Sequence, residues 1–566
     1  MNKIIELIKS SKVFFVWFLV VFLLAFLISN RHSKTGTFNW MTPLWADEAG
    51  VYVYLPSLFI YDFDAKSFPE KIEEKMGFGF SLDLKNNKVI TRYTYGVAIL
   101  QAPFFILAHI LAGILDQPQD GFSGIYHQAP NWAALFYSFL GLFFLWKFLL
   151  FYYRQRIAIF TLISIFFGTN LYYYAVDSTG MSHIYSFAMF AIVAWLSKKM
   201  MSVELKSRNL YLIAWSLLFA LIVLTRLSNL LLFPFLFCLD CQSVAEFRLR
   251  IKKFFTSREI FILLVASLLV FLPQFLYWKY VSGSFITDSY QGYGFSNWKS
   301  PKILELWFAP NNGLFLYSPF YMVAMVGLFM MIKHHKFNGW LILLTFLVLT
   351  YVFASWFMVS FGCGYGSRNF VEYTVLFSLP VGYFFSQIVK YSLVKRIAII
   401  VAVVVLVVFN VNLIYAYPRC FENSDWDFQK YTSFLIKLNR QHVSLDMEGQ
   451  ERMIPSTEYS KTIYLHAEEI NSLDYKKAVV RSEITLEALN SEALIVLSIG
   501  RNDSTIFWGS SQLRDQIPND KLNKKQKVEA EFYIPFPFPA NSTISVFIWN
   551  TNKESLTVSK LDLYLE

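Results

Sequence analysis

The residues with the clearest capacity for chemistry are two adjacent carboxylates, Asp47 and Glu48, in the segment Trp40-Met-Thr-Pro-Leu-Trp-Ala-Asp-Glu-Ala49. They follow the first apolar segment of the chain by about twenty residues and lie among tryptophans. A carboxylate at a membrane surface can take the proton of a hydroxyl group as a general base in group transfer. The structural alternative is that Asp47 caps a helix from Glu48 to Phe59, because Asp is a good N-cap.

The composition is that of a membrane protein. Of the 566 residues, 55% are hydrophobic and only 16% are charged, which is too apolar for a soluble protein of this length. The net charge of +10 does not indicate nucleic-acid binding, because Lys and Arg fall in short clusters between apolar segments. Four cysteines do not form a disulfide framework, and Cys238-Leu-Asp-Cys241 lacks the second pair that a zinc site needs.

The pattern of apolar segments predicts eleven membrane spans. The first, Val13 to Ile28, resembles a signal peptide, but Ser29-Asn30-Arg31-His32 is a poor cleavage site, so we interpret it as an uncleaved span with a cytoplasmic N-terminus. Basic clusters occupy every second loop, as the positive-inside rule requires. The ten further spans are Asn131 to Tyr153, Ile157 to Tyr174, His183 to Leu196, Leu210 to Thr225, Leu227 to Leu239, Ile260 to Tyr280, Leu314 to Ile332, Trp340 to Phe357, Tyr373 to Ile388 and Ile397 to Tyr415.

One further apolar segment, Val97 to Leu115, is nearly long enough to span. Counting it as a span would place the Arg154/Arg156 cluster and every later cluster outside, against the positive-inside rule. We therefore predict that it lies in the outer interface as a re-entrant or surface helix. The first outer loop, residues 30–130, then carries Asp47 and Glu48.

The chain divides into a membrane domain and an outer domain. Hydropathy falls after Tyr415, so we predict a membrane domain of residues 1–415, a linker of 416–450 and an outer domain of 451–566. Alternating apolar runs between turn residues predict an all-β sandwich for the last part. These runs are Lys477 to Glu487, Ala493 to Ile499, Lys527 to Ile534, Thr543 to Asn550 and Leu556 to Glu566.

The predicted outer loops hold a mixture of acidic, basic, glycine and aromatic residues that the inner loops lack. Arg226 is notable because it separates two short apolar segments, and a charge at membrane depth is costly unless it faces a cavity or a partner. Besides Asp47 and Glu48, the outer candidates are Arg92, Tyr93, Asp177, His183, Arg226, the segment Asp288 to Tyr293, Tyr365, Arg368 and Glu372.

This architecture resembles the GT-C class of membrane glycosyltransferases over roughly Met1 to Tyr415. Four short motifs look most like bacterial family 39 or dolichyl-phosphate-mannose-protein mannosyltransferase-like proteins: Arg92-Tyr-Thr-Tyr-Gly96, Met181-Ser-His-Ile-Tyr-Ser186, Leu224-Thr-Arg226 and Gly364 to Glu372. The resemblance implies transfer of a sugar from a polyprenyl-phosphate-linked donor to an envelope glycan, lipid or protein on the outer face of a bacterial plasma membrane. It also implies a periplasmic C-terminal domain, jelly-roll-like as in arabinosyltransferases.

The resemblance assigns roles to individual residues. Because the acid of the first outer loop is the base in GT-C enzymes, Asp47 receives that role, with Glu48 as an orienting neighbour or alternative base. The lipid phosphate that leaves needs positive charge or a metal, and Arg226, Arg368 and Arg92 are the candidates for binding it. The alternative for Arg368 is an ion pair with Glu372, four residues on.

The remaining candidates are expected to bind substrate: Tyr93, Asp177, His183, Tyr365 and Glu372. His183 together with Asp177 could also hold a divalent metal, although a third ligand is not evident, so metal dependence stays open. In the outer domain, five aromatic residues could stack on carbohydrate, although for most of them we expect a place in the sandwich core. They are Phe507, Trp508, Phe536, Phe538 and Trp549.

Two other functions stay open. An oligosaccharyltransferase would move a whole glycan from a diphosphate-linked donor onto protein and would require a metal. A transporter or flippase would show paired, symmetrical halves with polar residues at mid-membrane, whereas here the chemically interesting residues lie at the outer surface.

Overall fold

The computed structural model of this chain forms two compact units. The first consists mainly of residues 1–32 and 43–415, and the second holds the C-terminal domain. The structure describes residues 2–33, 37–38, 42–202, 205–288, 290, 292–417, 426, 428, 431–432, 443–446, 451–454, 456–467, 477–488, 491–501, 504–518, 521–534 and 541–565.

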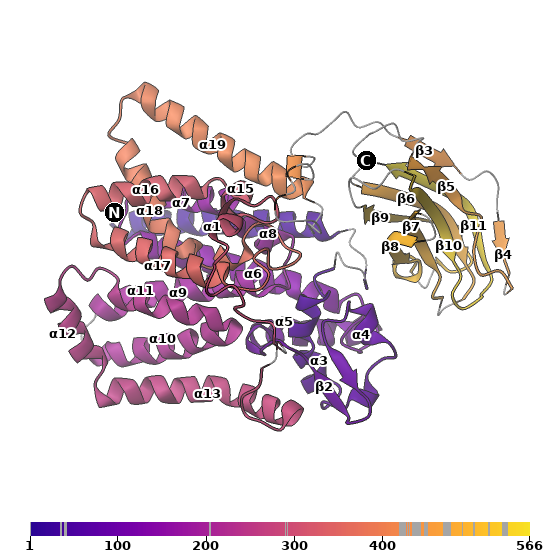
Figure 1. Cartoon of the computed structure of the whole chain (residues 1–566), viewed down its shortest axis with the longest axis horizontal. Helices are drawn as coiled ribbons and strands as arrows, with labels where there is room; N and C mark the ends of the chain where they lie inside the picture. Colours follow the sequence, from indigo (N-terminus) through magenta and orange to yellow (C-terminus); the bar gives the residue numbers. More distant parts are fainter. Residues whose placement is uncertain are drawn as a thin grey trace. The chain divides into compact units, whose positions relative to one another are not determined.

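The first unit is helical, and its long helices run side by side (Figure 1). Each of the eleven segments predicted to span contains helix. The longer elements are α1 (Asn2–His32), α5 (Gly96–Ile114), α6 (Ala129–Leu149), α7 (Gln155–Gly168), α9 (Ser182–Ser202), α10 (Leu205–Thr225), α12 (Val244–Phe254), α13 (Ser257–Ser282), α16 (Tyr321–Lys333), α17 (Phe337–Ala354), α18 (Thr374–Ile388) and α19 (Leu393–Ala416).

Shorter elements connect these helices. They are α2 (Asp47–Tyr52), α3 (Tyr54–Phe59), η1 (Ala65–Ser67), α4 (Ile72–Lys75), η2 (Tyr126–Gln128), α8 (Leu171–Val176), η3 (Leu227–Leu232), α11 (Phe233–Cys238), α14 (Ile303–Phe308), α15 (Leu314–Tyr317) and η4 (Arg368–Phe370), with a hairpin of β1 (Ser81–Asp83) and β2 (Lys88–Ile90). Within the described residues, six helices are long and apolar enough to cross a membrane: α1, α5, α6, α13, α17 and α19. The chain is therefore a membrane protein.

Side-chain contacts define two opposite ends of the helical unit. At the first, which we name the site end, Thr179 before α9 donates a hydrogen bond to Asn131 at the start of α6 (2.7 Å). Arg226, directly after α10, contacts His183 at the start of the same α9. The first turns of α6 and α9 and the last turn of α10 therefore lie together.

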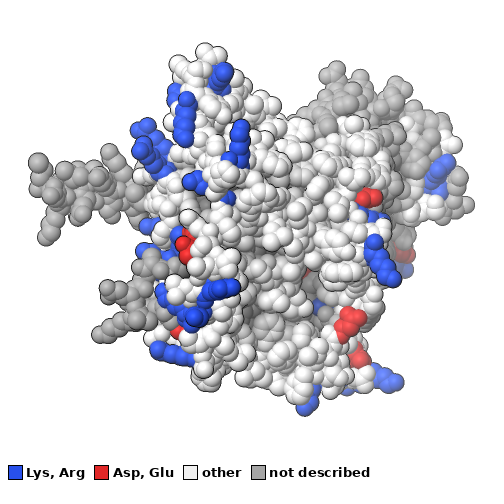
Figure 2. Space-filling view, turned by 60° about the vertical axis from the view of Figure 1, so that its left-hand side comes forward, with Lys and Arg blue, Asp and Glu red and all other residues white. Residues whose placement is uncertain are grey.

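The second, which we name the basic end, is joined around Asp240. Tyr152, after α6, donates to Asp240 Oδ2 (2.8 Å), and Lys198 near the end of α9 forms an ion pair with the same carboxylate. Asn338 at the start of α17 also donates to Asp240. In Figure 2, which brings this side of the molecule forward, Lys and Arg gather with few Asp or Glu among them. The loops predicted to be cytoplasmic by charge therefore share one end.

Helix α5 has contacts to the site end near both of its ends, although it is long and apolar enough to cross a membrane. Thr94, just before it, donates to the backbone of Leu224 in the last turn of α10. At the other end of the helix, His109 contacts Tyr126 (2.6 Å), which precedes α6. Because both neighbours belong to the site end, both contacts place α5 beside that end, and its interfacial position stays a prediction.

The second unit contains a sandwich of two antiparallel sheets. One has the strand order β5-β10-β7-β8, and the other β3-β11-β6-β9, with β4 also pairing with β11. From β4 onward, successive strands lie in opposite sheets except for the β7–β8 hairpin, which is the order of a jelly roll. The bounds are β3 (Val443–Asp446), β4 (Glu451–Met453), β5 (Ile463–His466), β6 (Lys477–Leu486), β7 (Leu494–Arg501), β8 (Ser504–Gln512), β9 (Gln526–Tyr533), β10 (Thr543–Trp549) and β11 (Leu556–Leu565).

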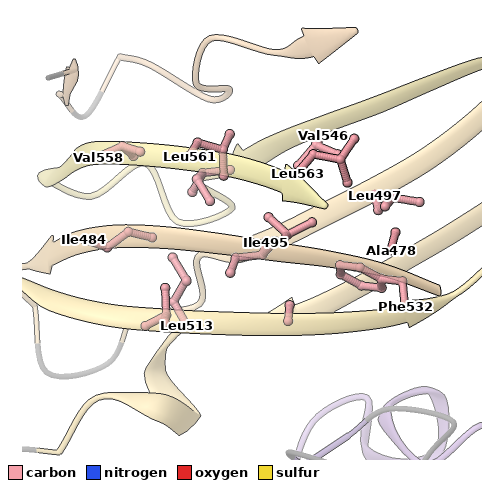
Figure 3. Packing of buried hydrophobic residues seen from close by; sticks show 14 of the residues in the cluster. Ala478, Ile484, Ile495, Leu497, Leu513, Phe532, Val546, Val558, Leu561 and Leu563 are labelled. Carbon is pink, nitrogen blue, oxygen red and sulfur yellow. The ribbon is translucent and has the colours of Figure 1, made fainter. Parts of the chain in front are cut away.

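Alternating side chains of both sheets fill the space between them (Figure 3). In the first sheet, Val546 of β10 faces Leu497 of β7 in register, and both are fully buried. The five predicted runs coincide with β6, β7, β9, β10 and β11. Strand β8 was not predicted because it is largely exposed and lacks alternation. Strand β3 lies inside 416–450, so the sheet begins within the segment predicted as a linker.

The aromatic residues of β8 face either the core or the outside of the sandwich, according to their position along the strand. Phe507 packs against the core, as expected for most of the aromatic residues. Trp508 lies outside the core and is 50% exposed, because neighbouring residues of a strand face opposite sides. Trp508 meets Trp549 edge to face, with ring centroids 6.4 Å apart. Phe536 and Phe538 lie outside the described residues.

Candidate active site

Asp47 is the first residue of α2, and its carboxylate binds two partners instead of capping the helix. The N-cap residue is Ala46, in a left-handed conformation (φ 48°), and no side chain caps the helix. Tyr93 donates its hydroxyl proton to Asp47 Oδ1, and Arg368 Nη2 lies 3.2 Å from Oδ2. The capping alternative is therefore wrong. With 40% of its side chain exposed, Asp47 stays accessible to a substrate.

Glu48 points to a different partner from its neighbour. Ser178, in the loop between α8 and α9, donates its hydroxyl proton to Glu48 Oε1 (2.7 Å). Gly180 of the same loop packs so closely that a Cβ atom there would lie 2.9 Å from Glu48 Cβ. The segment Glu48 to Phe59, predicted as one helix, is divided between α2 and α3. The two adjacent carboxylates are thus held by separate parts of the chain.

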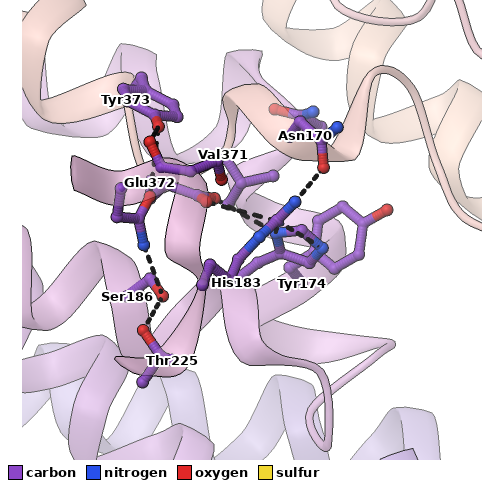
Figure 4. Close-up of polar contacts among 12 residues, drawn as sticks. Asn170, Tyr174, His183, Ser186, Thr225, Val371, Glu372 and Tyr373 are labelled. Atoms are coloured by element: carbon purple, nitrogen blue, oxygen red, sulfur yellow. Dashed lines mark hydrogen bonds and ion pairs between the residues drawn. The ribbon is translucent and has the colours of Figure 1, made fainter. Parts of the chain in front are cut away.

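A second cluster surrounds the guanidinium of Arg226. Its Nη1 lies 2.6 Å from His183 Nδ1 and 3.3 Å from Glu372 Oε1, and its Nη2 donates to Asn369 Oδ1. In Figure 4, His183 and Glu372 point toward each other, and the ring of Tyr174 packs beside His183 with centroids 4.5 Å apart. His183 and Glu372 are buried, whereas the side chain of Arg226 is 19% exposed. Arg226 is thus the part of this cluster that a ligand can reach.

The protonation states of His183 and Glu372 depend on each other and on the contact with Arg226. A guanidinium only donates hydrogen bonds, so His183 Nδ1 accepts when it binds Arg226. The same nitrogen lies 3.2 Å from Glu372 Oε2, and it can bind a Glu372 carboxylate only when it carries a proton. Burial raises the pKa of Glu372 to about 7, against the opposing effect of Arg226. Near neutral pH, Glu372 is therefore present in both protonation states.

Electrostatics connect the two clusters. Burial lowers the pKa of Arg368, but the charge of Asp47, the hydrogen bond to Asp47 and the neighbouring Tyr174 and Tyr93 together raise this pKa above its ordinary value. Burial and then the charge of Asp47 raise the pKa of Tyr93 far above its ordinary value, so Tyr93 keeps its proton and acts as a donor. The two guanidinium groups and the accessible carboxylate thus form one polar surface at the site end.

Tyr290 is a residue of this surface that the sequence did not single out. Burial raises the pKa of Tyr290, and the charge of Asp47 raises it further, while Arg226, Arg368 and Arg92 lower it. Its only sequence signal was membership of the outer segment Asp288 to Tyr293. The ring packs edge to face on Trp356, with centroids 5.8 Å apart. The loop between α13 and α14 therefore brings an aromatic hydroxyl to the candidate site.

The alternative for Arg368 as a local ion pair with Glu372 is wrong, because each residue has a distant partner. Arg368 binds Asp47, 321 residues away in the chain, and Glu372 binds Arg226. The helical turn η4 covers only Arg368–Phe370, so the spacing of four does not place both side chains on one helical face. Arg92 is exposed, with its guanidinium 5.9 Å from the ring centre of Tyr93.

Two predicted substrate contacts take other roles. Asp177 is buried and forms an ion pair with Arg31 at the end of α1, so it does not pair with His183 as a metal ligand. Tyr365 is fully buried, and its hydroxyl donates to the backbone oxygen of Tyr317 (2.8 Å), which makes it part of the packing beneath the site. In the part of the chain that the structure describes, no three His, Cys, Asp or Glu residues form a metal-binding group.

No protein-family model and no curated protein matches this chain. Among solved structures, ArnT from Cupriavidus metallidurans bound to undecaprenyl phosphate is similar with a TM-score of 0.44 and 11% identity, over 75% of this chain and 70% of that one. The archaeal oligosaccharyltransferase AglB from Archaeoglobus fulgidus, in complex with an inhibitory peptide and a dolichol-phosphate, is similar with a TM-score of 0.38 and 12% identity. That match covers 70% of this chain but only 55% of AglB, about half its length. Both likenesses are partial, and nothing about the activity of this chain follows from them.

Proposed function

We propose that this protein is an inverting glycosyltransferase of the GT-C class. It would transfer a sugar from a polyprenyl-phosphate-linked donor to an envelope glycan, lipid or protein on the outer face of the plasma membrane of a bacterium. The observation that carries the proposal is the pairing of one accessible carboxylate, Asp47, with Arg368, on a surface that Arg226 also reaches. Such a surface provides a base for a hydroxyl and cations for a phosphate.

In the proposed reaction, Asp47 takes the proton of the acceptor hydroxyl as its oxygen attacks the anomeric carbon. The bond between that carbon and the donor phosphate oxygen breaks, and the polyprenyl phosphate leaves with the electron pair. Tyr93 and Arg368 hold the carboxylate through one oxygen each, which fixes its orientation toward the acceptor. A positioned base of this kind contributes about 10²- to 10⁴-fold to the rate.

The negative charge that develops on the leaving phosphate needs donors aimed at it. Arg226 and Arg368 are both partly exposed and both fixed by neighbouring side chains. A guanidinium has five N–H donors, and within the described residues Arg368 is seen to use one of them on Asp47. Further donors are therefore available for phosphate oxygens.

The cysteines support an outer location of the site. Cys363, in the segment that leads to Arg368, is disulfide-bonded, whereas Cys238 and Cys241 beside Asp240 at the basic end are free thiols. Disulfides persist in oxidising compartments such as the periplasm. The positive-inside rule independently favours a cytoplasmic position for the basic end. Both patterns favour the same orientation.

The function can be tested by comparing the masses of envelope glycans, lipids and glycoproteins between cells with and without this protein. We expect one acceptor to lose the mass of a single sugar, and the mass to return with the wild-type gene but not with Asp47→Asn. Loss of a whole oligosaccharide from protein would instead indicate an oligosaccharyltransferase. An unchanged envelope together with accumulation of a lipid-linked glycan would favour a flippase.

The pKa of Glu372 leads to a pH-dependent prediction. Glu372 and a donor phosphate compete for Arg226, so protonation of Glu372 leaves more positive charge for the phosphate. As the pH falls from about 8 to about 6, through the raised pKa of about 7, we expect wild-type affinity for a polyprenyl phosphate to rise by about tenfold relative to Glu372→Gln. Because both proteins bind the same ligand, the ratio of their affinities removes the effect of protonation of the ligand itself.

The measurement is ligand binding to purified protein at several pH values. Glu372→Gln is a matched variant because its side chain keeps the size of Glu372 and has no charge at any of these pH values. An affinity ratio that does not change with pH would show that protonation of Glu372 does not affect binding of the phosphate.

A further inference from the structure

A pocket lies at the basic end, remote from the candidate active site. It is a partly open pocket between α9, α10, α11, α12 and α13. Its location follows from α9, whose first turn carries His183 in the site and whose later residue Ser197 lines the pocket. Fourteen residues of helix separate them, or roughly 21 Å at a rise of 1.5 Å per residue. The pocket is therefore distinct from the site.

The lining is mainly apolar and aromatic, as a hydrocarbon chain requires. The apolar lining residues that matter here are Leu212, Trp215, Phe233, Phe237, Ile260 and Leu263. Among them lies the hydroxyl of Ser216, which is buried and has no hydrogen-bond partner within the described residues. A pocket of this composition favours an acyl chain over a polar metabolite.

Helix α12 covers the pocket and has the composition of a helix that lies at a membrane surface. It is capped by Ser243, whose side chain accepts a hydrogen bond from the backbone of Glu246, and none of its residues is buried. One face carries an apolar stripe at helical spacing: Val244, Phe247, Ile251 and Phe254. The other face carries exposed cations: Arg248, Lys252 and Lys253. Amphipathic helices of this kind bind anionic lipid surfaces.

Arg250 lies where this helix meets the pocket. Its Nη1 donates to the backbone oxygens of Phe237 (2.6 Å) and Leu239 (2.7 Å), which fixes the guanidinium at the end of α11. Arg250 itself also lines the pocket. Glu259, a buried acidic residue, lines the pocket as well. The excess positive charge comes from the three exposed cations of α12 and from exposed Arg258.

We infer that this pocket binds an anionic phospholipid of the membrane. One acyl chain occupies the apolar lining and the phosphate meets Arg250, while the exposed cations of α12 attract the net negative charge of the headgroup. A phosphate headgroup fits because a fixed guanidinium binds phosphate with strong, charge-assisted hydrogen bonds. The inference does not depend on the proposed transferase activity, because the pocket and the site lie at opposite ends of α9.

The test uses the full-length protein, purified in detergent and depleted of lipid. Phosphatidylglycerol and phosphatidylcholine with the same acyl chains are added, and retained lipid is measured by native mass spectrometry. We expect phosphatidylglycerol to be retained more tightly, and Arg250→Gln to lower its retention by about tenfold, as loss of a charge-assisted hydrogen bond implies. Arg156→Gln is the matched control, because Arg156 is an exposed arginine that neither lies on α12 nor lines the pocket.

A second variant tests the acyl chain. Ser216→Leu adds bulk inside the pocket without adding charge, and we expect it to reduce retention of both lipids. A phosphatidylglycerol with a photoreactive acyl chain should in parallel label wild-type peptides containing Trp215 or Phe237, so the test stands even if Ser216→Leu does not fold. Equal effects of Arg250→Gln and Arg156→Gln, no labelling of these peptides, or displacement of the lipid by a polyprenyl phosphate would each overturn the inference.

Discussion

Asp47→Asn is expected to lower sugar transfer by about 10²- to 10⁴-fold while the protein stays folded in the membrane. The amide keeps the shape of the side chain and can still accept the hydrogen bond from Tyr93, but it cannot take up the proton of an acceptor hydroxyl. The stability cost is expected to be small, because the ion pair with Arg368 involves a carboxylate that is 40% exposed. The measurement is transfer rate at saturating donor and acceptor.

Two variants serve as controls for this prediction. Glu48→Gln keeps an oxygen that can accept the hydrogen bond from Ser178, so we expect it to retain most of the activity. Asp62→Asn changes an exposed acid of the same loop and should have no effect. If Glu48→Gln is inactive and Asp47→Asn is active, the base is Glu48. If both variants are active, neither carboxylate takes the proton.

Arg226→Gln is expected to raise the KM for the lipid-linked donor by about 10- to 100-fold, with little change in the KM for the acceptor. The reason is the loss of a fixed guanidinium that reaches the polar surface and offers charge-assisted hydrogen bonds to phosphate. The measurement is steady-state kinetics with donor and acceptor varied separately. If the donor KM does not change, Arg226 does not bind the donor phosphate.

The single variant also leaves the buried carboxyl of Glu372 without its guanidinium partner, which can destabilise the fold. The double variant Arg226→Gln/Glu372→Gln separates the two effects, because the neutral amide at 372 has no charge to leave unpaired. We expect the double variant to regain thermal stability but to keep the high donor KM. Lys85→Gln is the control for a general loss of positive charge, because Lys85 is an exposed cation of the predicted first outer loop that belongs to neither cluster.

Features that depend on local pattern could be predicted from the sequence. The apolar segments gave the helices, and the alternation of basic clusters identified the loops that gather at the basic end. The prediction of an interfacial position for α5 follows from charge alone, since its length and hydropathy would equally suit a span. Strands with a regular inward and outward alternation, such as β10, were also predictable, whereas β8 was not, because its side chains are largely exposed.

The residue types of the candidate site could also be predicted, but their pairing could not. Both expected local contacts, the cap by Asp47 and the ion pair of Arg368 with Glu372, are replaced by contacts between distant segments. Asp177 pairs with Arg31 of the first helix, a residue that the sequence offered only as part of a poor cleavage site. Tyr290 reaches the site on a loop whose path no local pattern indicates.

The sequence by itself therefore determined that this is a membrane protein with its carboxylates and arginines on one side and a β sandwich at its end. Hydropathy, charge clusters and strand alternation are patterns within short stretches of sequence, so they can be recognised without knowledge of the tertiary structure. Only the tertiary structure decided that Asp47 faces Arg368 and that Arg226 is shared by His183 and Glu372. Those partners are brought together by helix packing, because a buried or half-buried charge must find an opposite charge wherever the fold places one.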